Sequence, residues 1–234
     1  MLTEWVNKLT AKVLPNHCGL CRLPVEPDLA GSVFCAACLA YFSSQPRCQC
    51  CGLATHAVVR HCGQCLLNKP LWSRLYCVGE YQAPLSRYVH RLKDGGQYWH
   101  AKTLSSLLLP VIDRKPDMVT FVPLHWRRYC WRGYNQSQHL AWHISKGLGV
   151  KCEAVFRKTK ATVKQQGMGR KQRVKNLHEA FCLRKSINAE HVAIVDDVLT
   201  TGSTVEQLCP LLYQSGVKIV DIYCICRTSE PKSR

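Results

Sequence analysis

The chain has 234 residues, 47% of them hydrophobic, and its 32 lysines and arginines outnumber its 15 aspartates and glutamates for a formal net charge of +17. This length fits one ordinary α/β domain with a small extra module, and the charge favours an anionic partner such as nucleic acid, a nucleotide-like ligand or an acidic membrane surface. The longest apolar stretch, residues 107–112, is far too short to span a bilayer, which excludes a transmembrane helix.

Residues 1–15 predict an amphipathic helix and not an export signal, because polar and apolar residues alternate and no continuous apolar core is present. The apolar stripe of this helix consists of Leu2, Trp5, Val6, Leu9 and Val13. Without an export signal we expect the protein in the cytoplasm, where thiols stay reduced and clustered cysteines bind metal. We expect the helix to pack on the protein itself, and contact with the inner face of the cytoplasmic membrane is the alternative.

The sixteen cysteines are concentrated near the N-terminus, where nine of them lie between residues 18 and 65. Eight of these nine form four C-x-x-C pairs, which are Cys18/Cys21, Cys35/Cys38, Cys48/Cys51 and Cys62/Cys65. A C-x-x-C turn presents two thiolates on one side, and two such turns complete a tetrahedral Cys₄ zinc site. We therefore predict two structural zinc ions, one shared by the first two pairs and one by the last two. An interleaved pairing stays open, as does replacement of a neighbouring ligand by the odd thiol, Cys50.

From residue 71 onwards, strand and helix patterns alternate. Strands are expected over 75–81, 118–122, 152–156, 192–195 and 218–226, and helices over 85–92, 104–109, 138–148 and 205–212. Alternation of this kind predicts a parallel α/β sheet, which binds its ligands beyond the carboxyl ends of the strands. We expect two domains, with the N-terminal helix and the double zinc module in residues 1–70 and the α/β domain in residues 71–234.

Residues 192–204 read VAIVDDVLTTGST and combine a buried strand, two acids and a hydroxyl-rich turn. The acids are Asp196 and Asp197, and the TTGST turn consists of Thr200, Thr201, Gly202, Ser203 and Thr204. Where such a turn leads into a helix, backbone N–H groups and the helix dipole bind phosphate, and the hydroxyls add donors. The carboxylates would face sugar hydroxyls or a hydrated Mg²⁺. The turn alone also fits an ordinary strand–turn–helix connection, so the prediction of a phosphate site rests on the ordered combination.

Two basic segments add candidate ligand contacts. Residues 123–136 read PLHWRRYCWRGYNQ and place Arg127, Arg128 and Arg132 among aromatic rings directly after a strand. Arginine binds phosphate bidentately, and tryptophan or tyrosine faces stack on bases. Residues 157–181 are nearly free of acids, which is typical of a loop that closes over a phosphorylated ligand or contacts nucleic acid. For both segments a solvated basic surface is the alternative.

Together these features resemble the ComF/GntX family of competence-associated proteins. The resemblance covers nearly the whole chain and is carried by the four C-x-x-C pairs, RGYNQ at 132–136, R-x-T-x-x-T-x-x-Q at 157–165, R-x-x-R-x-x-N at 170–176 and VAIVDDVLTTGST. It implies a type I phosphoribosyltransferase-like parallel sheet with helices on both faces, behind an N-terminal double zinc-ribbon module.

The resemblance also implies roles for individual residues. Asp196 and Asp197 would bind the ribose hydroxyls of 5-phosphoribosyl-1-pyrophosphate (PRPP), which is held with Mg²⁺, and residues 200–204 would bind its 5′-phosphate. Residues 123–128 would form the pyrophosphate loop, and residues 157–176 the flexible loop. Contacts to pyrophosphate or DNA are expected from Arg127, Arg128, Arg132, Arg157, Gln165, Arg170 and Arg173.

The function that the resemblance implies is that of a cytoplasmic factor in competence, DNA uptake or DNA utilisation. Such a factor would bind PRPP and handle single-stranded DNA beside DNA-translocation proteins. Two alternatives stay open: a true phosphoribosyltransferase with an unidentified acceptor, and a non-catalytic PRPP-sensing adaptor. In this fold the residues that bind PRPP also stabilise its leaving group, so we assign no catalytic residue from the sequence.

Overall fold

A computed structural model describes residues 17–26, 29, 32–42, 45–159 and 180–228. The chain divides into two compact units, Met1–Ser44 and Gln45–Arg234. The helix expected over residues 1–15 and most of the expected flexible loop lie outside the described residues. No helix in the described ranges is long and apolar enough to cross a membrane.

The described part of the first unit is small and has few apolar side chains to bury. Helix α2 (Ala36–Leu39) leads directly into the 3₁₀ turn η2 (Ala40–Phe42). Phe34 is buried and packs on Phe42, with their ring centroids 4.9 Å apart. Three of the four cysteines in this unit are also buried, so thiols make up much of an interior that is too small for a large apolar core.

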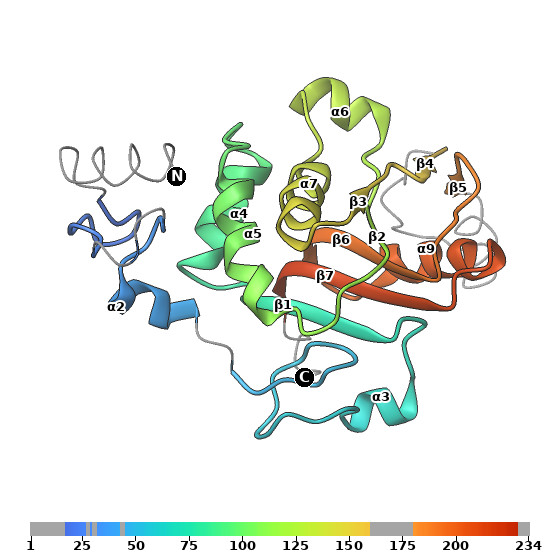
Figure 1. Cartoon of the computed structure of the whole chain (residues 1–234), viewed down its shortest axis with the longest axis horizontal. Coiled ribbons are helices and arrows are strands. Elements are labelled where there is room, and N and C mark those ends of the chain that lie inside the picture. The colour runs from blue at the N-terminus through green and yellow to red at the C-terminus, as the bar shows by residue number, and fades with distance from the viewer. Residues whose placement is uncertain (1–16, 27–28, 30–31, 43–44, 160–179, 229–234) are drawn as a thin grey trace, which may run out of the picture. The chain divides into compact units, whose positions relative to one another are not determined.

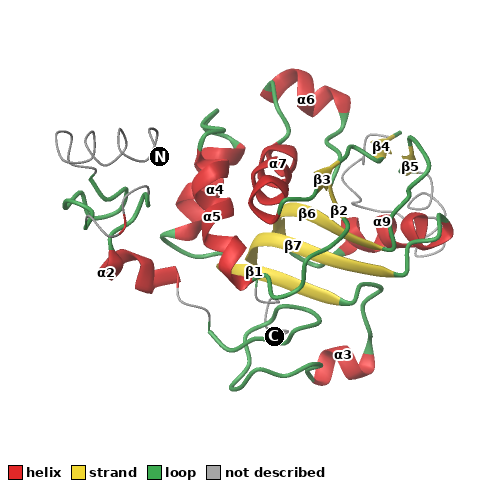
Figure 2. Cartoon of the chain, in the orientation of Figure 1, coloured by secondary structure: helices red, strands yellow, loops and turns green. Residues whose placement is uncertain are grey.

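The second unit is built on a five-stranded parallel sheet with the strand order β1-β7-β6-β2-β3 (Figure 2). Its strands are β1 (Arg74–Glu80), β2 (Met118–Phe121), β3 (Lys151–Cys152), β6 (His191–Leu199) and β7 (Ile219–Arg227). The strands expected over 75–81, 118–122 and 218–226 are confirmed to within one residue at each end. The strand expected over 192–195 runs on to Leu199, so both acids of the motif lie inside it.

Helices cover both faces of this sheet, as expected (Figure 1). The helices that pack on the sheet are α4 (Leu85–Lys93), α5 (His100–Leu108, continued by η3 at Leu109–Val111), α7 (Gln136–Leu148) and α9 (Ser203–Gln214). Helix α3 (Gly63–Leu67) lies in the segment of the last two C-x-x-C pairs, and α6 (Trp126–Arg132) stands away from the sheet after β2 (Figure 1). Val192 and Ile194 pack with apolar residues of α9 in one core. The alternate residues Ala193 and Val195 are fully buried too, on the face that α7 covers.

The prediction of a strand over residues 152–156 is wrong. The chain leaves the parallel sheet after Cys152, and β4 (Phe156–Lys158) pairs antiparallel with β5 (Phe181–Leu183) in a separate two-stranded sheet. Val155 and Phe156 are both buried in the core beside α9, so their apolar character reports burial and not the periodicity of one continuous strand.

The pyrophosphate loop expected over residues 123–128 is a loop only through His125. Helix α6 begins at Trp126, because the His125 ring nitrogen Nδ1 accepts a hydrogen bond from the backbone N–H of Arg127 at 3.3 Å. Helix α7 likewise begins at Gln136, two residues earlier than expected, because the Asn135 side chain accepts from the N–H of Ser137 at 3.0 Å.

The last two C-x-x-C pairs fold with the sheet. The backbone N–H of Leu75 in β1 donates to the carbonyl oxygen of Gln49 at 2.9 Å, and the Arg74 guanidinium donates to the Gln49 side chain at 3.0 Å. The compact units therefore separate after Ser44, between the two cysteine groups. The boundary expected at residue 70 stays a prediction about the sequence modules.

Candidate functional site

The two acids of the motif are held near the end of β6 by helices that pack on the sheet. The hydroxyl of Ser137, in the first turn of α7, donates to Asp196 Oδ1 at 3.0 Å, and the N–H of Asp197 donates to the same oxygen at 2.9 Å. The ammonium of Lys93, the last residue of α4, lies 3.2 Å from Asp197 Oδ2. Lys93 and Ser137 carry no motif of their own, so neither was among the site residues predicted from the sequence.

The environment of Asp196 controls its charge. Burial, and then the negative charge of Asp197, raise the pKa of Asp196 to about 7, although its hydrogen bonds and the charge of Lys93 act in the opposite direction. Near neutral pH this carboxyl group is therefore close to its titration midpoint. A cation or a hydroxyl donor placed beside it would favour the ionised form.

The TTGST turn joins β6 to α9 and presents hydroxyls and N–H groups at the start of the helix. Gly202 is the N-cap residue and has a φ of 82°, a left-handed conformation that favours glycine. Thr201 Oγ1 accepts from the N–H of Ser203 at 3.3 Å and lies 3.2 Å from its hydroxyl. The turn and the acids thus meet at the carboxyl edge of the sheet, where this class of fold binds ligands.

Trp72 makes the glycine at position 202 necessary for a second reason. A Cβ atom on Gly202 would lie 2.7 Å from Cη2 of the Trp72 ring. The ring is buried, and its Nε1–H donates to the carbonyl oxygen of Cys50 at 2.7 Å. Trp72 therefore packs against the TTGST turn and is also hydrogen-bonded to Cys50, which lies between the predicted zinc ligands Cys48 and Cys51.

Arg227, the last residue of β7, makes a second connection to the same turn. Its guanidinium is buried and donates through Nε to the carbonyl oxygen of Cys51 at 2.9 Å. Nη1 donates to the carbonyl oxygens of Leu199, at 3.3 Å, and Thr200. Arg227 was not among the site residues predicted from the sequence, since its only signal there is a cation at the end of an apolar strand.

The eight predicted zinc ligands form two groups of four. Within each group the sulfur atoms all lie within 4.8 Å of one another, and the groups are Cys18, Cys21, Cys35, Cys38 and Cys48, Cys51, Cys62, Cys65. The groups join the first two and the last two C-x-x-C pairs, which is the sequential order expected, and Cys50 belongs to neither group. Four thiolates at this separation suit tetrahedral zinc, so each group can hold one ion.

Backbone N–H groups prepare some of these sulfur atoms for metal. Burial acts to raise the pKa of the Cys18 thiol, but N–H groups, first that of Cys21, outweigh it and lower the pKa to about 6. In the second group, the N–H of Cys62 donates to the sulfur of Cys48 at 3.2 Å. Hydrogen bonds of this kind stabilise the thiolate, which is the form that binds zinc.

The predicted cationic contacts are only partly brought together. Arg127 and Arg128 are exposed on α6, whereas Arg132 is engaged by Asp94 at 3.0 Å and by Gln136 at 2.8 Å. Three further predicted contacts, Gln165, Arg170 and Arg173, lie outside the described residues.

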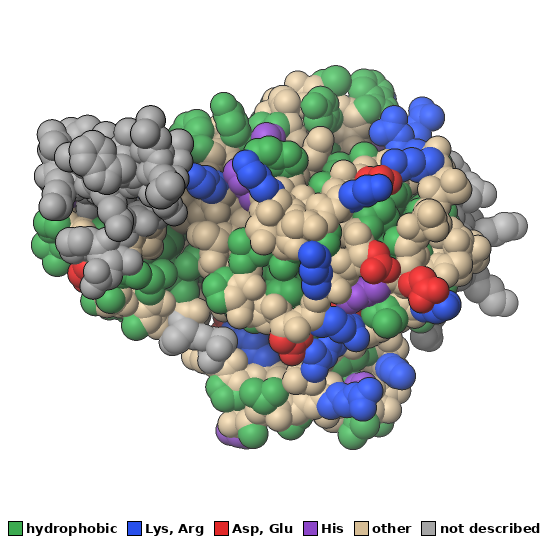
Figure 3. Space-filling view, viewed as in Figure 1, with side chains coloured by type: hydrophobic (Ala, Val, Ile, Leu, Met, Phe, Trp, Pro, Cys, Tyr) green, Lys and Arg blue, Asp and Glu red, His purple; other side chains and the backbone are tan. Residues whose placement is uncertain are grey.

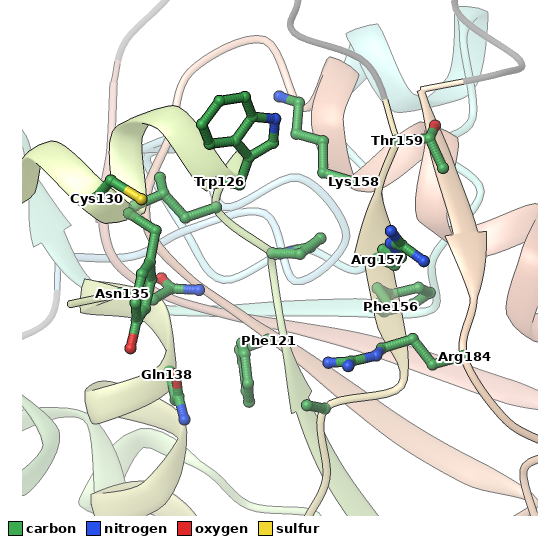
Figure 4. A pocket seen from close by; sticks show the side chains of 14 residues that line it. Phe121, Trp126, Cys130, Asn135, Gln138, Phe156, Arg157, Lys158, Thr159 and Arg184 are labelled. Atoms are coloured by element: carbon green, nitrogen blue, oxygen red, sulfur yellow. The ribbon is translucent and has the colours of Figure 1, made fainter. Parts of the chain in front are cut away.

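Arg157 lines a cavity of about 800 Å³ between the end of β2, helix α6 and the β4–β5 hairpin (Figure 4). Lys158 and Arg184 approach it from the hairpin side, and Asn135 and Gln138 lie on the opposite side. None of the described residues that line this basic cavity is acidic. Lys158 and Arg184 were not among the predicted site residues, and nothing in their spacing distinguishes them from other surface cations.

Comparison with known proteins agrees with this geometry. Residues 136–234 match the family model described as Phosphoribosyl transferase domain. With the parallel sheet, the helices on both faces and the acid pair beside the TTGST turn, this match defines a protein of the type I phosphoribosyltransferase fold. Among solved structures, glutamine PRPP amidotransferase from B. subtilis is 18% identical, with a TM-score of 0.39. The similarity covers 53% of this chain and 25% of that chain, and the fold assignment does not rest on it.

The relatives are similar over nearly their whole length. DNA utilization protein YhgH of Escherichia coli (strain K12) is 39% identical, over 92% of this chain and 98% of the relative. The protein of the same name from Salmonella typhi is 36% identical over the same shares. Competence protein F of Haemophilus influenzae is 35% identical, over 85% of this chain and 92% of the relative. The chain belongs to the ComF/GntX family.

The contact between Trp72 and the TTGST turn predicts a stability difference between two alanine substitutions. Gly216→Ala places a side chain at a φ of 96° in open space, so it costs about 1 kcal/mol of backbone strain. Gly202→Ala adds a clash with a buried, hydrogen-bonded ring and should cost roughly 1–3 kcal/mol more. Urea unfolding of the two variants measures the difference, and equal losses would contradict the contact.

The separation of the cysteine groups predicts different consequences of metal loss. Protein purified without chelator should contain two zinc ions. The double variant Cys18→Ser/Cys38→Ser should lose the ion of the first group, and the double variant Cys48→Ser/Cys65→Ser should lose the ion of the second group. Only the Cys48→Ser/Cys65→Ser double variant should have a lower melting temperature of the sheet unit, because the second cysteine group folds with the sheet. Elemental analysis and thermal unfolding test this. A folded protein without zinc, or the same Tm for the two double variants, would contradict the assignment.

Proposed function

We propose that this chain is a cytoplasmic factor in DNA uptake or DNA utilisation that binds PRPP at the end of β6 and single-stranded DNA on a basic, aromatic surface. The observation that carries the proposal is the Asp196–Asp197 pair beside the TTGST turn, in a chain whose relatives are named DNA utilization protein and Competence protein F. This role implies DNA-translocation proteins as partners and places the protein near the inner face of the cytoplasmic membrane.

The residues at the end of β6 suit the separate parts of PRPP. The N–H groups and hydroxyls of the TTGST turn provide donors for the 5′-phosphate. The carboxylates of Asp196 and Asp197 would accept hydrogen bonds from the ribose hydroxyls, and Lys93 and Ser137 hold them in place. A bound Mg²⁺ would neutralise the pyrophosphate, since this cation prefers one or two carboxylates together with ligand oxygens.

A second candidate function, phosphoribosyl transfer, is favoured by the basic cavity. Asn135 lines this cavity and lies two residues from Ser137, which holds Asp196, so the cavity adjoins the predicted ribose site. Phe121 and Phe156 supply apolar faces, and the amides of Asn135 and Gln138 supply donors and acceptors. Such a lining and a volume of about 800 Å³ suit a planar acceptor with polar edges.

The DNA-binding half of the proposal is supported by charge and exposure. The chain carries a net charge of +17, and Figure 3 shows many basic and few acidic side chains on the face in view. On α6, Arg127 and Arg128 lie beside Trp126 and Trp131, whose exposed fractions are 62% and 79%. Exposed cations and large aromatic rings on one helix are the groups that hold the backbone and bases of a single strand.

Removal of the acid pair should abolish PRPP binding. Asp196→Asn with Asp197→Asn removes charge-assisted hydrogen bonds worth about 3–6 kcal/mol together, which corresponds to at least a roughly 100-fold loss of affinity. Calorimetry with and without Mg²⁺, at about pH 8 so that Asp196 is ionised in the wild type, measures the loss.

The matched control for this substitution is Asp113→Asn. This acid forms an ion pair with Arg74 at the amino end of β1, away from the carboxyl edge of the sheet. The PRPP affinity of the Asp113→Asn variant should equal that of the wild type. Unchanged affinity in the folded double variant would refute the PRPP site. Release of pyrophosphate by the wild type would identify an enzyme, whereas binding without release would identify a sensor.

Binding of single-stranded DNA should depend steeply on salt, with little preference for sequence. Each phosphate contact contributes about 0.7 to the slope of log affinity against log salt concentration, so Arg127→Ala and Arg128→Ala should each reduce the slope by about that amount. Lys218→Ala is the control, because this lysine is paired with Glu190 at the amino edge of the sheet. Fluorescence anisotropy over a salt series measures the slopes, and a flat salt response would refute the electrostatic contacts.

A further inference from the structure

A second cavity, of about 840 Å³, opens beside the basic cavity and is lined mainly by rings. Phe121 and Tyr129 line both this cavity and the basic cavity. The ring residues that line this aromatic cavity but not the basic one are Tyr98, Trp99, Tyr134, His139, Trp142 and His143. They come from the segment that precedes α5, from the α6–α7 connection and from α7 itself. Tyr98, Trp99 and Trp142 have exposed fractions of 51%, 58% and 53%, so these rings face solvent together, and a large exposed apolar patch of this kind marks a binding surface.

The inner rings support the outer ones. Tyr98 and His139 lie with ring centroids 5.3 Å apart and planes tilted by 30°, and Tyr134 meets His139 edge to face at 5.7 Å. Tyr134 is buried, and its hydroxyl donates to the carbonyl oxygen of Leu92. Trp142 meets His143 edge to face at 4.7 Å. The exposed rings are therefore held by packing before any ligand arrives, which lowers the entropy cost of binding.

The polar groups of the aromatic cavity are neutral or cationic. None of the described residues that line it is acidic, and Lys102 lines it directly. The ammonium of Lys146 lies 5.3 Å from the centre of the Trp142 ring. Burial lowers the pKa of both His139 and His143, and nearby positive charge adds to this at His143. At neutral pH each imidazole thus offers one donor and one acceptor, as the edge of a nucleobase does.

The aromatic cavity continues into the basic cavity. Phe121, Tyr129, Asn135, Gln138 and Ala154 line both of them. A strand whose bases occupy the aromatic cavity can therefore continue towards Arg157 and Lys158, whose charges suit its phosphates.

We propose that the aromatic cavity holds unstacked bases of a single DNA strand, with Trp99 and Trp142 as the stacking residues. This inference rests on the proposed function and locates its DNA site beyond the arginines of α6. The combination of flat exposed rings, neutral imidazole and amide groups and neighbouring cations matches a base together with its phosphate. Duplex DNA is a poor occupant, because its bases are already stacked and their faces are covered.

Trp99→Ala and Trp142→Ala test the site with two labelled strands of equal length and charge. One is an oligothymidylate, and the other is an abasic strand that has the same phosphates and no bases. Each substitution should weaken binding of the oligothymidylate about 5-fold or more, because a stacking partner is lost. The abasic strand should bind wild type and variants equally, and the salt slope should not change, because no phosphate contact is removed.

The conservative variant Trp142→Phe provides the matched control, since it keeps a ring at the same position and should retain most of the oligothymidylate affinity. Zinc content and circular dichroism report whether each variant is folded. The cavity proposal is overturned if the alanine variants bind oligothymidylate as the wild type does, or if they lose affinity equally for the abasic strand. A wild-type protein that binds neither strand would instead overturn the DNA-binding half of the proposed function, and the cavity proposal with it.

Discussion

The candidate site depends on one buried cation, the guanidinium of Arg227, which holds the carbonyl groups at the end of β6 against a turn of the second cysteine group. Burying an arginine is costly unless its donors are satisfied, and here backbone carbonyl oxygens satisfy them from both sides. The Trp72 ring joins the same two parts of the chain through Cys50 and Gly202. The second cysteine group is therefore a structural support of the TTGST turn, although the two are far apart in sequence.

The start of α7 has a comparable role on the other side of the acids. Asn135 donates to the carbonyl oxygen of Val122 at 3.0 Å, caps α7 and lines both cavities. Two residues later, Ser137 holds Asp196. The first turn of α7 therefore contacts both cavities and the acid pair. This arrangement is compatible with an enzyme and with a sensor, because both need the ligand sites to be in contact.

Local patterns predicted the parts of this protein that local sequence determines. The apolar run before Asp196, the TTGST turn and the spacing of the C-x-x-C pairs each lie within a short segment, and the structure contains the strand, the helix start and the two cysteine groups. Arg227 and Trp72 could not be predicted in this way, because Arg227 contacts a carbonyl 176 positions away and Trp72 one 22 positions away. The error over residues 152–156 has a related cause: Val155 and Phe156 are buried against α9 and not in the parallel sheet, and hydrophobicity alone does not distinguish these environments.

The position of β7 has a consequence for the order in which the protein assembles. This strand follows every other described strand in the chain, yet it lies between β1 and β6 in the sheet. During synthesis, β1 and β6 therefore each keep an unpaired edge until β7 emerges and inserts between them. A nascent chain interrupted before that point exposes two open strand edges, the kind of surface that chaperones bind and that aggregates form from.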